Sequence, residues 1–253
     1  MPISISSGRV PVNDQSRLSR TASGLACAVL CWIAAAACAS PVKLSPAQTV
    51  QETDLVDVAA YVPDVLLDIR YASAGNFTGD VVDGYLAPKC YLLRPVAEAV
   101  ARVADDLRPQ GLSLQIFDCY RPARAVRRLV AWARDPDDQD TKPEYYPNLD
   151  KSQLLDGYIA ETSGHSRGAT IDLSLMRCEH GACTPLDMGT GFDYFDTLAN
   201  TADPRITDEQ KHNRQLLLDA MARHGFRNYP MEWWHYTLQP EPAPTVAFDV
   251  PVQ

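Results

Sequence analysis

The chain has 253 residues, of which 46% are hydrophobic and 22% are charged, with 19 prolines and 13 glycines. This is the composition of a globular protein, and it excludes a disordered, collagen-like or low-complexity chain. The formal net charge is -9, from 32 acidic and 23 basic residues. An acidic balance argues against nucleic acid as the partner, because binding to a phosphate backbone depends on lysine and arginine.

The N-terminal residues 1–39 have the pattern of a secretory signal. Arginines precede a mostly apolar run from Leu25 to Ala37, which as a helix would extend about 20 Å and is too short for a bilayer core. The run leads into Ala37-Cys38-Ala39, so we expect cleavage after Ala39. The same residues weakly resemble a lipoprotein signal with a lipidated Cys38. We predict an exported, periplasmic protein, either soluble or attached to a membrane through a lipid on Cys38; a buried alanine-rich helix is the alternative to a signal.

The remaining sequence predicts a single α+β domain, with a mainly antiparallel sheet packed against helices. A polar leader occupies residues 40–54. Capping signals and helically spaced apolar residues indicate helices, and alternation indicates strands. In chain order we expect a strand at 65–71, a helix at 95–107, a strand at 112–117, a helix at 124–133, a strand at 169–175, a helix at 207–224 and a strand at 234–238. These elements do not alternate regularly, which disfavours a doubly wound fold.

Four cysteines lie outside the predicted signal, at Cys90, Cys119, Cys178 and Cys183. An even number in an exported chain indicates two disulfides, for which three pairings are possible. Cys178 and Cys183 flank a short loop that they could close, which would leave Cys90 to pair with Cys119. A zinc site is the alternative interpretation, but no Cys-x-x-Cys spacing occurs.

The stretch Ser-Gly-His-Ser-Arg-Gly-Ala-Thr-Ile-Asp at 163–172 is the first candidate for chemistry. His165 lies in a turn, and Asp172 lies on the polar face of the expected strand, opposite Ile171 and Leu173. A buried carboxylate needs a partner, and a metal ion would supply one. A solvated strand face with a turn histidine is the alternative.

The second candidate is Glu232-Trp233-Trp234-His235-Tyr236. Two bulky aromatic residues beside Glu232 create an apolar setting, which should raise the pKa of its carboxyl group. In a regular strand Glu232 and His235 would face opposite ways, so a shared site requires a turn or bulge at the two tryptophans. The alternative is an aromatic core strand with Glu232 paired to an arginine.

The two stretches together supply two imidazoles and two carboxylates. Three nitrogen or oxygen ligands and an open position are typical of a catalytic zinc. We predict one zinc ion per chain at the sheet face, with His165, Asp172 and His235 as ligands. Glu232 suits the general base that takes a proton from zinc-bound water. A structural zinc is disfavoured, because such sites usually have four protein ligands.

The third candidate is Asp118-Cys119-Tyr120-Arg121-Pro122, at the end of an expected strand. A guanidinium held there could bind a polarised carbonyl oxygen or a substrate carboxylate through two donors. A structural ion pair between Arg121 and Asp118 is the alternative.

These stretches resemble the D-alanyl-D-alanine dipeptidases of the VanX type, a branch of the zinc D-Ala-D-Ala peptidases in peptidase family M15. The shared pattern is Ser-x-His-x-x-Gly-x-x-x-Asp followed by Glu-Trp-Trp-His, and the resemblance covers about Leu55 to Leu238. Thr170 departs from it, because we expect alanine there; threonine would alter the pocket size but not the ligands. The export signal and the paired cysteines differ from the cytoplasmic members, which questions a resistance role rather than the chemistry.

The resemblance implies hydrolysis of the D-alanyl-D-alanine dipeptide to two D-alanines, with zinc at the three predicted ligands. Glu232 would act as base and acid, and Arg121 would stabilise the transition state. Ser163, Asp118 and Tyr120 are expected to contact the substrate. The alternatives are a D,D- or L,D-carboxypeptidase acting on peptidoglycan stem peptides, or a non-catalytic zinc-containing module that binds the cell wall. Retention of Glu232 and Arg121 disfavours the module.

The resulting division of the chain is a signal at 1–39, a leader at 40–54, a zinc dipeptidase domain at 55–240 and a C-terminal tail at 241–253. The partner implied is a small D,D-dipeptide, and the pattern indicates no particular oligomeric state.

Overall fold

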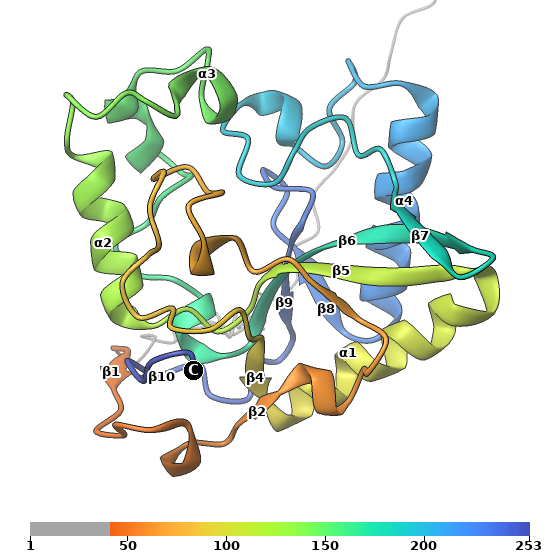
Figure 1. Ribbon diagram of the computed structural model, residues 1–253, viewed down its shortest axis with the longest axis horizontal. Helices are drawn as coiled ribbons and strands as arrows, with labels where there is room; N and C mark the ends of the chain where they lie inside the picture. The colour runs from red at the N-terminus through yellow and green to blue at the C-terminus, as the bar shows by residue number, and fades with distance from the viewer. Residues whose placement is uncertain (1–40) are drawn as a thin grey trace, which may run out of the picture. The chain divides into compact units, whose positions relative to one another are not determined.

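A six-stranded sheet forms the centre of the computed structural model, which describes residues 41–253 (Figure 1). The predicted signal at 1–39, with Cys38, lies outside the described residues. The strands are β1 (Lys43–Leu44), β2 (Leu55–Asp57), β3 (Leu66–Leu67), β4 (Tyr91–Leu93), β5 (Leu112–Asp118), β6 (Thr170–Glu179), β7 (Ala182–Pro185), β8 (Phe226–Asn228), β9 (His235–Leu238) and β10 (Val246–Ala247). The α-helices are α1 (Arg94–Leu107), α2 (Ala123–Ala133), α3 (Lys142–Tyr145) and α4 (Asp208–Arg223).

The strand order in the central sheet is β3-β5-β6-β9-β8, and β7 pairs with the far end of β6. β3 runs parallel to β5, whereas β5 with β6, β6 with β9, β8 with β9 and β6 with β7 pair antiparallel. Seven consecutive residues of β6 from Thr170 are buried, so both faces of this strand are covered. The polar face that the sequence shows on β6 therefore faces the interior of the protein.

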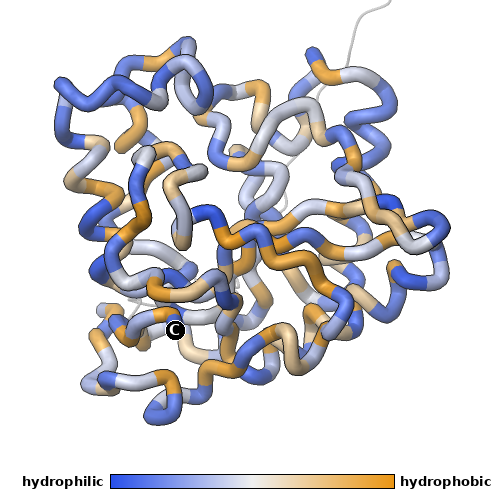
Figure 2. Tube along the Cα trace, viewed as in Figure 1, coloured by the Kyte–Doolittle hydropathy of each residue, from blue (hydrophilic) through white to orange (hydrophobic). Residues whose placement is uncertain are grey.

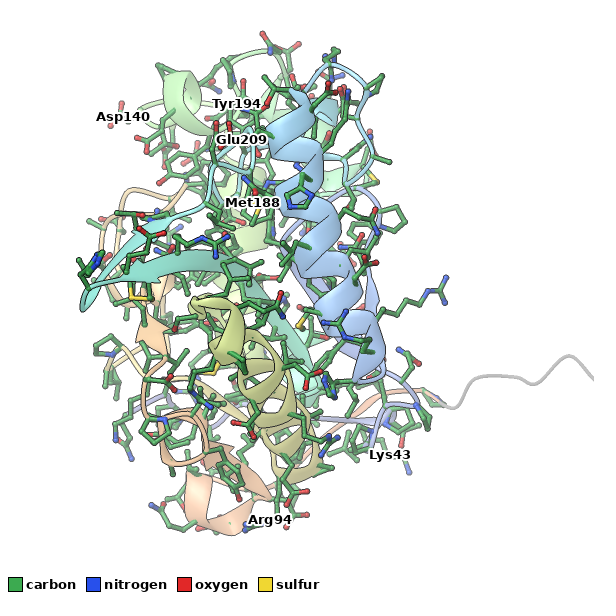
Figure 3. The ribbon with its side chains drawn as sticks, turned by 90° about the vertical axis from the view of Figure 1, so that its right-hand side faces the viewer. Lys43, Arg94, Asp140, Met188, Tyr194 and Glu209 are labelled. Atoms are coloured by element: carbon green, nitrogen blue, oxygen red, sulfur yellow. A yellow bond between two sulfur atoms is a disulfide. The ribbon has the colours of Figure 1, made fainter. Side chains whose placement is uncertain are left out.

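Two helices, α1 and α4, pack against the central sheet. α1 has Pro95 in its first turn, and its stripe of Val96, Val100, Val103 and Leu107 is buried, as expected from the spacing. α4 begins with a capping box between Thr207 and Gln210. Figure 3 shows α1 and α4 packed together on one side of the sheet. α2 lies away from these two helices, at the left in Figure 1.

Segments near both ends of the described chain pack against the domain. β1 in the polar leader pairs parallel with β10, and β2 pairs antiparallel with β4 in a separate two-stranded sheet. The Phe248 N–H donates to the Ser166 carbonyl (2.8 Å), and Val250 and Val252 are fully buried. Residues 241–253 thus contribute to the core.

The predicted mixed α+β fold is confirmed, and the three longer helices lie where their capping and periodicity placed them. The strand expected at 65–71 is wrong in extent. It ends at Leu67, and a 3-10 helix follows at Arg70–Ala72. The hairpin formed by β6 and β7 was not predicted, because all four residues of β7 are exposed and provide no alternating pattern. Figure 2 shows hydrophobic residues along the central strands and hydrophilic residues at the hairpin tip and outer loops.

Both disulfides are present, as Cys90–Cys119 and Cys178–Cys183. The second joins directly paired residues of β6 and β7. Within residues 41–253, no helix combines the length and the apolar character that crossing a membrane requires.

Candidate active site

Three acidic or imidazole side chains lie in a row across the central sheet. Asp118 on β5 is paired with Asp172 on β6, and Asp172 is paired with His235 on β9. Directly paired residues present their side chains on the same face of a sheet. Strand register therefore brings together three groups that are far apart in the sequence, with the Asp172 carboxylate in the middle.

His165 reaches this row from a short 3-10 helix, His165–Arg167, which precedes β6. The turn ends at Gly168, which has a φ of 70° and lies so close to Leu55 that a Cβ would come within 2.7 Å of its Cδ2. The imidazole of His165 is 1% exposed, and its Nδ1 lies 2.7 Å from the Cys119 carbonyl oxygen. Since a carbonyl only accepts, Nδ1 carries the proton and Nε2 keeps its lone pair for another partner.

The donor atoms of His165, Asp172 and His235 lie within 4.8 Å of one another. His165 Nε2 is 3.2 Å from Asp172 Oδ2, His235 Nδ1 is 3.1 Å from Asp172 Oδ1, and the two ring nitrogens are 3.4 Å apart. A tetrahedral zinc with bonds of 2.0–2.1 Å places its ligand atoms about 3.3 Å from one another. Asp172 Oδ1 is buried and accepts no hydrogen bond among the described residues. The spacing, this unsatisfied oxygen and the donor types all fit a zinc ion.

The predicted turn at the two tryptophans is present and brings Glu232 to the same site. The His235 N–H donates to the Glu232 carbonyl (3.3 Å), which reverses the chain over Trp233 and Trp234, both buried. Glu232 Oε2 consequently lies 3.4 Å from His235 Nδ1. Burial raises the pKa of Glu232 to about 7, against the opposing positive charge of His235. The carboxyl group thus has the raised basicity expected from its apolar surroundings.

Arg121 forms the structural ion pair considered for it and also lines the cavity. Its Nε donates to Asp118 Oδ2 (2.9 Å), which is the structural pair, and its Nη2 lies 3.7 Å from Asp172 Oδ2. The guanidinium carbon lies 4.7 Å from the centre of the Tyr71 ring, a distance at which a cation–π interaction is favourable. One nitrogen therefore anchors the side chain, while the rest of the guanidinium faces the metal-ligand cluster.

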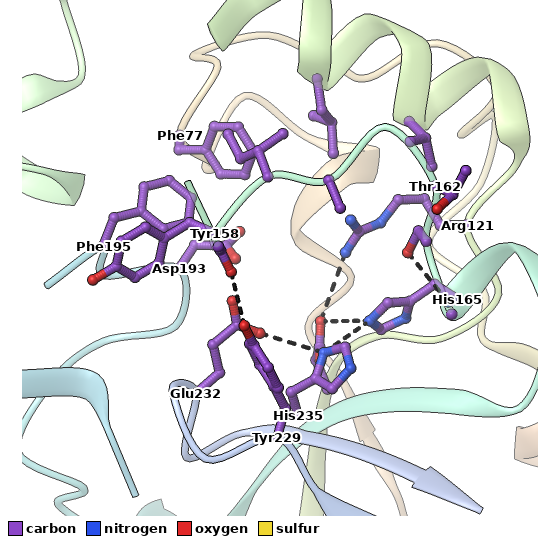
Figure 4. A pocket seen from close by; sticks show the side chains of 18 of the residues that line it. Phe77, Arg121, Tyr158, Thr162, His165, Asp193, Phe195, Tyr229, Glu232 and His235 are labelled. Atoms are coloured by element: carbon purple, nitrogen blue, oxygen red, sulfur yellow. Dashed lines mark hydrogen bonds and ion pairs between the residues drawn. The ribbon is translucent and has the colours of Figure 1, made fainter. Parts of the chain in front are cut away.

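These groups line one cavity of about 210 Å³. Figure 4 shows Arg121, His165 and His235 close together, with Glu232 beside His235. Aromatic and aliphatic side chains and the loop 157–164 form much of the remaining wall. Of the predicted site residues, the cavity is lined by Ser163, His165, Arg121, Asp172, Glu232 and His235.

Two of the predicted substrate contacts, Asp118 and Tyr120, do not line the cavity. Both are buried, at 0% and 1% exposure. The Tyr120 hydroxyl donates to the Val250 carbonyl (2.9 Å), and Asp118 accepts from the Tyr85 hydroxyl (2.6 Å) as well as from Arg121. Both side chains therefore stabilise the structure around the site instead of facing the cavity.

Thr170 also lies outside the cavity lining. Its hydroxyl is 2.9 Å from that of Thr237 on β9, across the sheet. Thr170 therefore does not itself bound the cavity, although Gly164, which it packs against, does. Its effect falls on Gly164, where an added Cβ would lie 2.6 Å from Thr170 Oγ1.

The sequence matches the family model Peptidase_M15, described as D-ala-D-ala dipeptidase, over residues 51–253. The chain belongs to this peptidase family. A D-alanyl-D-alanine dipeptidase of Enterococcus faecium is 40% identical over 193 residues, which are 76% of this chain and 95% of that protein. A D-alanyl-D-alanine dipeptidase of Streptomyces coelicolor is 38% identical over 200 residues, which are 79% of this chain and 98% of that protein. A D-alanyl-D-alanine dipeptidase of Escherichia coli is 36% identical over 186 residues, which are 74% of this chain and 85% of that protein.

Among solved structures, a mutant of the vancomycin resistance D,D-pentapeptidase VanY in complex with Zn(II) matches with a TM-score of 0.39 and 17% identity. The match covers 64% of this chain and 80% of that one.

The sequence did not identify two further groups in the cavity of this M15 peptidase, Asp193 and Tyr71. The Tyr71 hydroxyl donates to Asp193 Oδ2 (2.8 Å). Burial raises the pKa of Asp193 well above its usual range, although the positive charge of Arg121 opposes this. Asp193 has a φ of 57°, unusual for a residue other than glycine. A carboxylate at the end of Gly-Thr-Gly-Phe-Asp was the available signal, but no periodic pattern surrounds it.

Proposed function

We propose that this chain hydrolyses the D-alanyl-D-alanine dipeptide to two D-alanines, with one zinc ion held by His165, Asp172 and His235. The observation that supports this most is the convergence of their donor atoms beside Glu232, inside a cavity of a chain that is 36–40% identical to dipeptidases of this name. When bound, zinc would act as a Lewis acid that polarises the peptide carbonyl and activates water.

Glu232 is the proposed base and acid. Its carboxylate takes a proton from the attacking water and transfers it to the amine that leaves. A pKa raised by burial to about 7 suits both steps, because a group that titrates near the working pH can accept and release a proton. Its distance of 3.4 Å from His235 Nδ1 places it at the edge of the ligand cluster, where it can take the proton of the attacking water.

Arg121 is the proposed donor to the carbonyl oxygen as negative charge develops there. The bond from its Nε to Asp118 fixes the guanidinium in place before the substrate arrives. Such preorganised donors stabilise a transition state because no reorientation is needed during the reaction.

Asp193 favours a dipeptidase over a carboxypeptidase. A free dipeptide has an ammonium group close to its scissile bond, and this charge requires an acidic partner in a buried site. Asp193 lines the same cavity and has only the Tyr71 hydroxyl as its side-chain partner among the described residues. A stem peptide has no ammonium group at this position. The Asp193 carboxylate therefore suits the amino terminus of the small substrate.

The finer arrangement that we propose is a zinc site at the face of a mainly antiparallel sheet, where β5, β6 and β9 present Asp118, Asp172 and His235. Export through the signal at 1–39, with or without a lipid at Cys38, stays a proposal based on the sequence pattern. The same holds for a periplasmic location.

The test measures zinc content together with D-alanine release from D-Ala-D-Ala and from an N-acetylated analogue. We expect one zinc per chain and cleavage of the free dipeptide alone. His235→Ala should lose both metal and activity, whereas His224→Ala should keep both, because His224 closes α4 and binds Asp106 instead (2.7 Å). Equal cleavage of the blocked analogue would contradict a dipeptidase.

A further inference from the structure

One disulfide is connected to a proposed metal ligand through a single residue. Cys119 is bonded to Cys90 through its sulfur, and its carbonyl oxygen accepts the proton of His165 Nδ1 at 2.7 Å. Both cysteines are buried, at 0% and 1% exposure. The covalent link and the hydrogen bond to the ligand thus belong to the same residue.

Cys119 lies just beyond β5, which ends at Asp118. The disulfide ties this point to Cys90, immediately before β4 in the separate two-stranded sheet. The residues that follow the two cysteines are also joined, by a backbone hydrogen bond from the Tyr120 N–H to the Tyr91 carbonyl (2.9 Å). The disulfide therefore fixes the end of one sheet against another, at the residue whose carbonyl faces His165.

The segment after Cys119 also holds the chain around His165. The Arg121 N–H donates to the His165 carbonyl (3.3 Å), and the Ser166 hydroxyl donates to the Arg121 carbonyl (2.9 Å). A displacement of Cys119 would move the acceptor of the imidazole and would also disturb these two bonds. The backbone position and the ring orientation of His165 therefore depend on the same short segment.

We propose that the Cys90–Cys119 disulfide positions His165 for metal binding. By fixing the Cys119 carbonyl, it keeps the proton of the imidazole on Nδ1 and directs the lone pair of Nε2 at Asp172 and His235. Partners that hold a metal-bound histidine in this way set both its tautomer and its orientation. The proposal rests on the proposed function, since it takes His165 to be a zinc ligand.

The second disulfide offers a matched control. Cys178–Cys183 joins directly opposed residues of β6 and β7, at the exposed end of the hairpin. No hydrogen bond from either residue reaches the ligand cluster among the described contacts. A variant without this link lacks one disulfide but keeps the Cys119 carbonyl, the hydrogen-bond partner of His165, in place.

The experiment compares Cys90→Ala/Cys119→Ala with Cys178→Ala/Cys183→Ala. Zinc affinity is measured by competition with a chromophoric chelator, at a temperature where circular dichroism shows each protein to be folded. The visible spectrum of the Co(II)-substituted proteins reports ligand geometry. We expect the first variant to bind zinc roughly 10- to 100-fold more weakly than wild type and to give an altered Co(II) spectrum. The second should match wild type in both measurements.

Cys90→Val/Cys119→Ala, which refills part of the volume of the two sulfurs, replaces the first variant if that protein does not fold. Wild-type affinity and spectrum in a folded variant without the Cys90–Cys119 bond would overturn the proposal while the proposed function stands. An equal loss in both disulfide variants would also overturn it, since it would indicate a general loss of stability. Wild-type protein that binds no zinc would overturn the proposed function and this inference together.

Discussion

The substitution Asp118→Asn tests whether Asp118 acts through Arg121. Asp118 is fully buried, and its two oxygens accept from the Tyr85 hydroxyl (2.6 Å) and from Arg121 Nε (2.9 Å). Asparagine has nearly the same shape but no charge, and it has only one oxygen that can accept. In the most favourable arrangement of the asparagine, its neutral amide oxygen accepts from Arg121 and its amide nitrogen donates to the Tyr85 hydroxyl.

The cost is large because the Arg121 side chain is only 14% exposed. A charge-assisted hydrogen bond contributes about 1.5–3 kcal/mol, and we expect a loss of unfolding free energy in this range. The displaced guanidinium should lower kcat by about 10- to 100-fold, less than the roughly 10²–10³-fold cost of removing an oxyanion donor outright. Zinc content should not change, because Asp118 is not among the proposed ligands.

The assay is D-alanine release from D-Ala-D-Ala, with urea denaturation on the same samples. Tyr85→Phe is the control: it removes the other bond to Asp118 without changing a charge, so we expect a similar loss of unfolding free energy, about 1.5–3 kcal/mol, with nearly normal kcat. A rise in KM with an unchanged kcat in Asp118→Asn would show direct contact with the substrate and would refute this account. Wild-type kinetics would also refute it.

Four further predictions address the site. Glu232→Gln should keep zinc but lose at least about 10²-fold in kcat, because the proton acceptor is gone; normal turnover would exclude Glu232 as the base. Asp193→Asn should raise KM for the free dipeptide about tenfold or more through loss of a charged partner; an unchanged KM would show that the ammonium binds elsewhere. Gly164→Ala should reduce stability to urea by about 1–3 kcal/mol, because its Cβ would lie 2.6 Å from Thr170 Oγ1, and adding Thr170→Ala should restore most of it. Chelation of the metal should abolish D-alanine release and lower Tm, since zinc at this site binds only the folded chain; an unchanged Tm would argue against a bound metal.

The proposed ligands could be found from the sequence because each belongs to a short stretch whose residue types have few other uses. A histidine in a glycine-rich turn, an aspartate in a hydrophobic strand and Glu-Trp-Trp-His each suggest one donor. Even the turn at the tryptophans follows from a simple requirement, because Glu232 and His235 cannot share a site in a straight strand. The longer helices were equally accessible, since a capping box and a 3.6-residue period are local signals.

The roles of Asp118 and Tyr120 depend on strand register, which a single sequence does not contain. Both adjoin Arg121, and proximity in the chain suggested proximity to the substrate. The register shift in β5 between Ile116 and Asp118 aligns Asp118 with Asp172, but the Tyr85 hydroxyl and Arg121 occupy both oxygens of its carboxylate. Tyr120 points away to the C-terminal segment, where it binds the Val250 carbonyl. Contacts with distant parts of the chain, Tyr85 for Asp118 and Val250 for Tyr120, thus decide whether these residues reach the cavity.

Asp193 illustrates a second limit, which comes from backbone conformation. Its positive φ and its place after Gly189 and Gly191 belong to an irregular loop, where no periodicity relates sequence to facing. Only the packed structure brings its carboxylate to Tyr71, 122 positions away in the chain. Such a buried acid, with a single neutral donor, costs stability unless a cation neutralises it. The strain and the incomplete pairing at Asp193 therefore agree with the proposed role of this residue, to bind the ammonium group of the substrate, better than with a role in stabilising the fold.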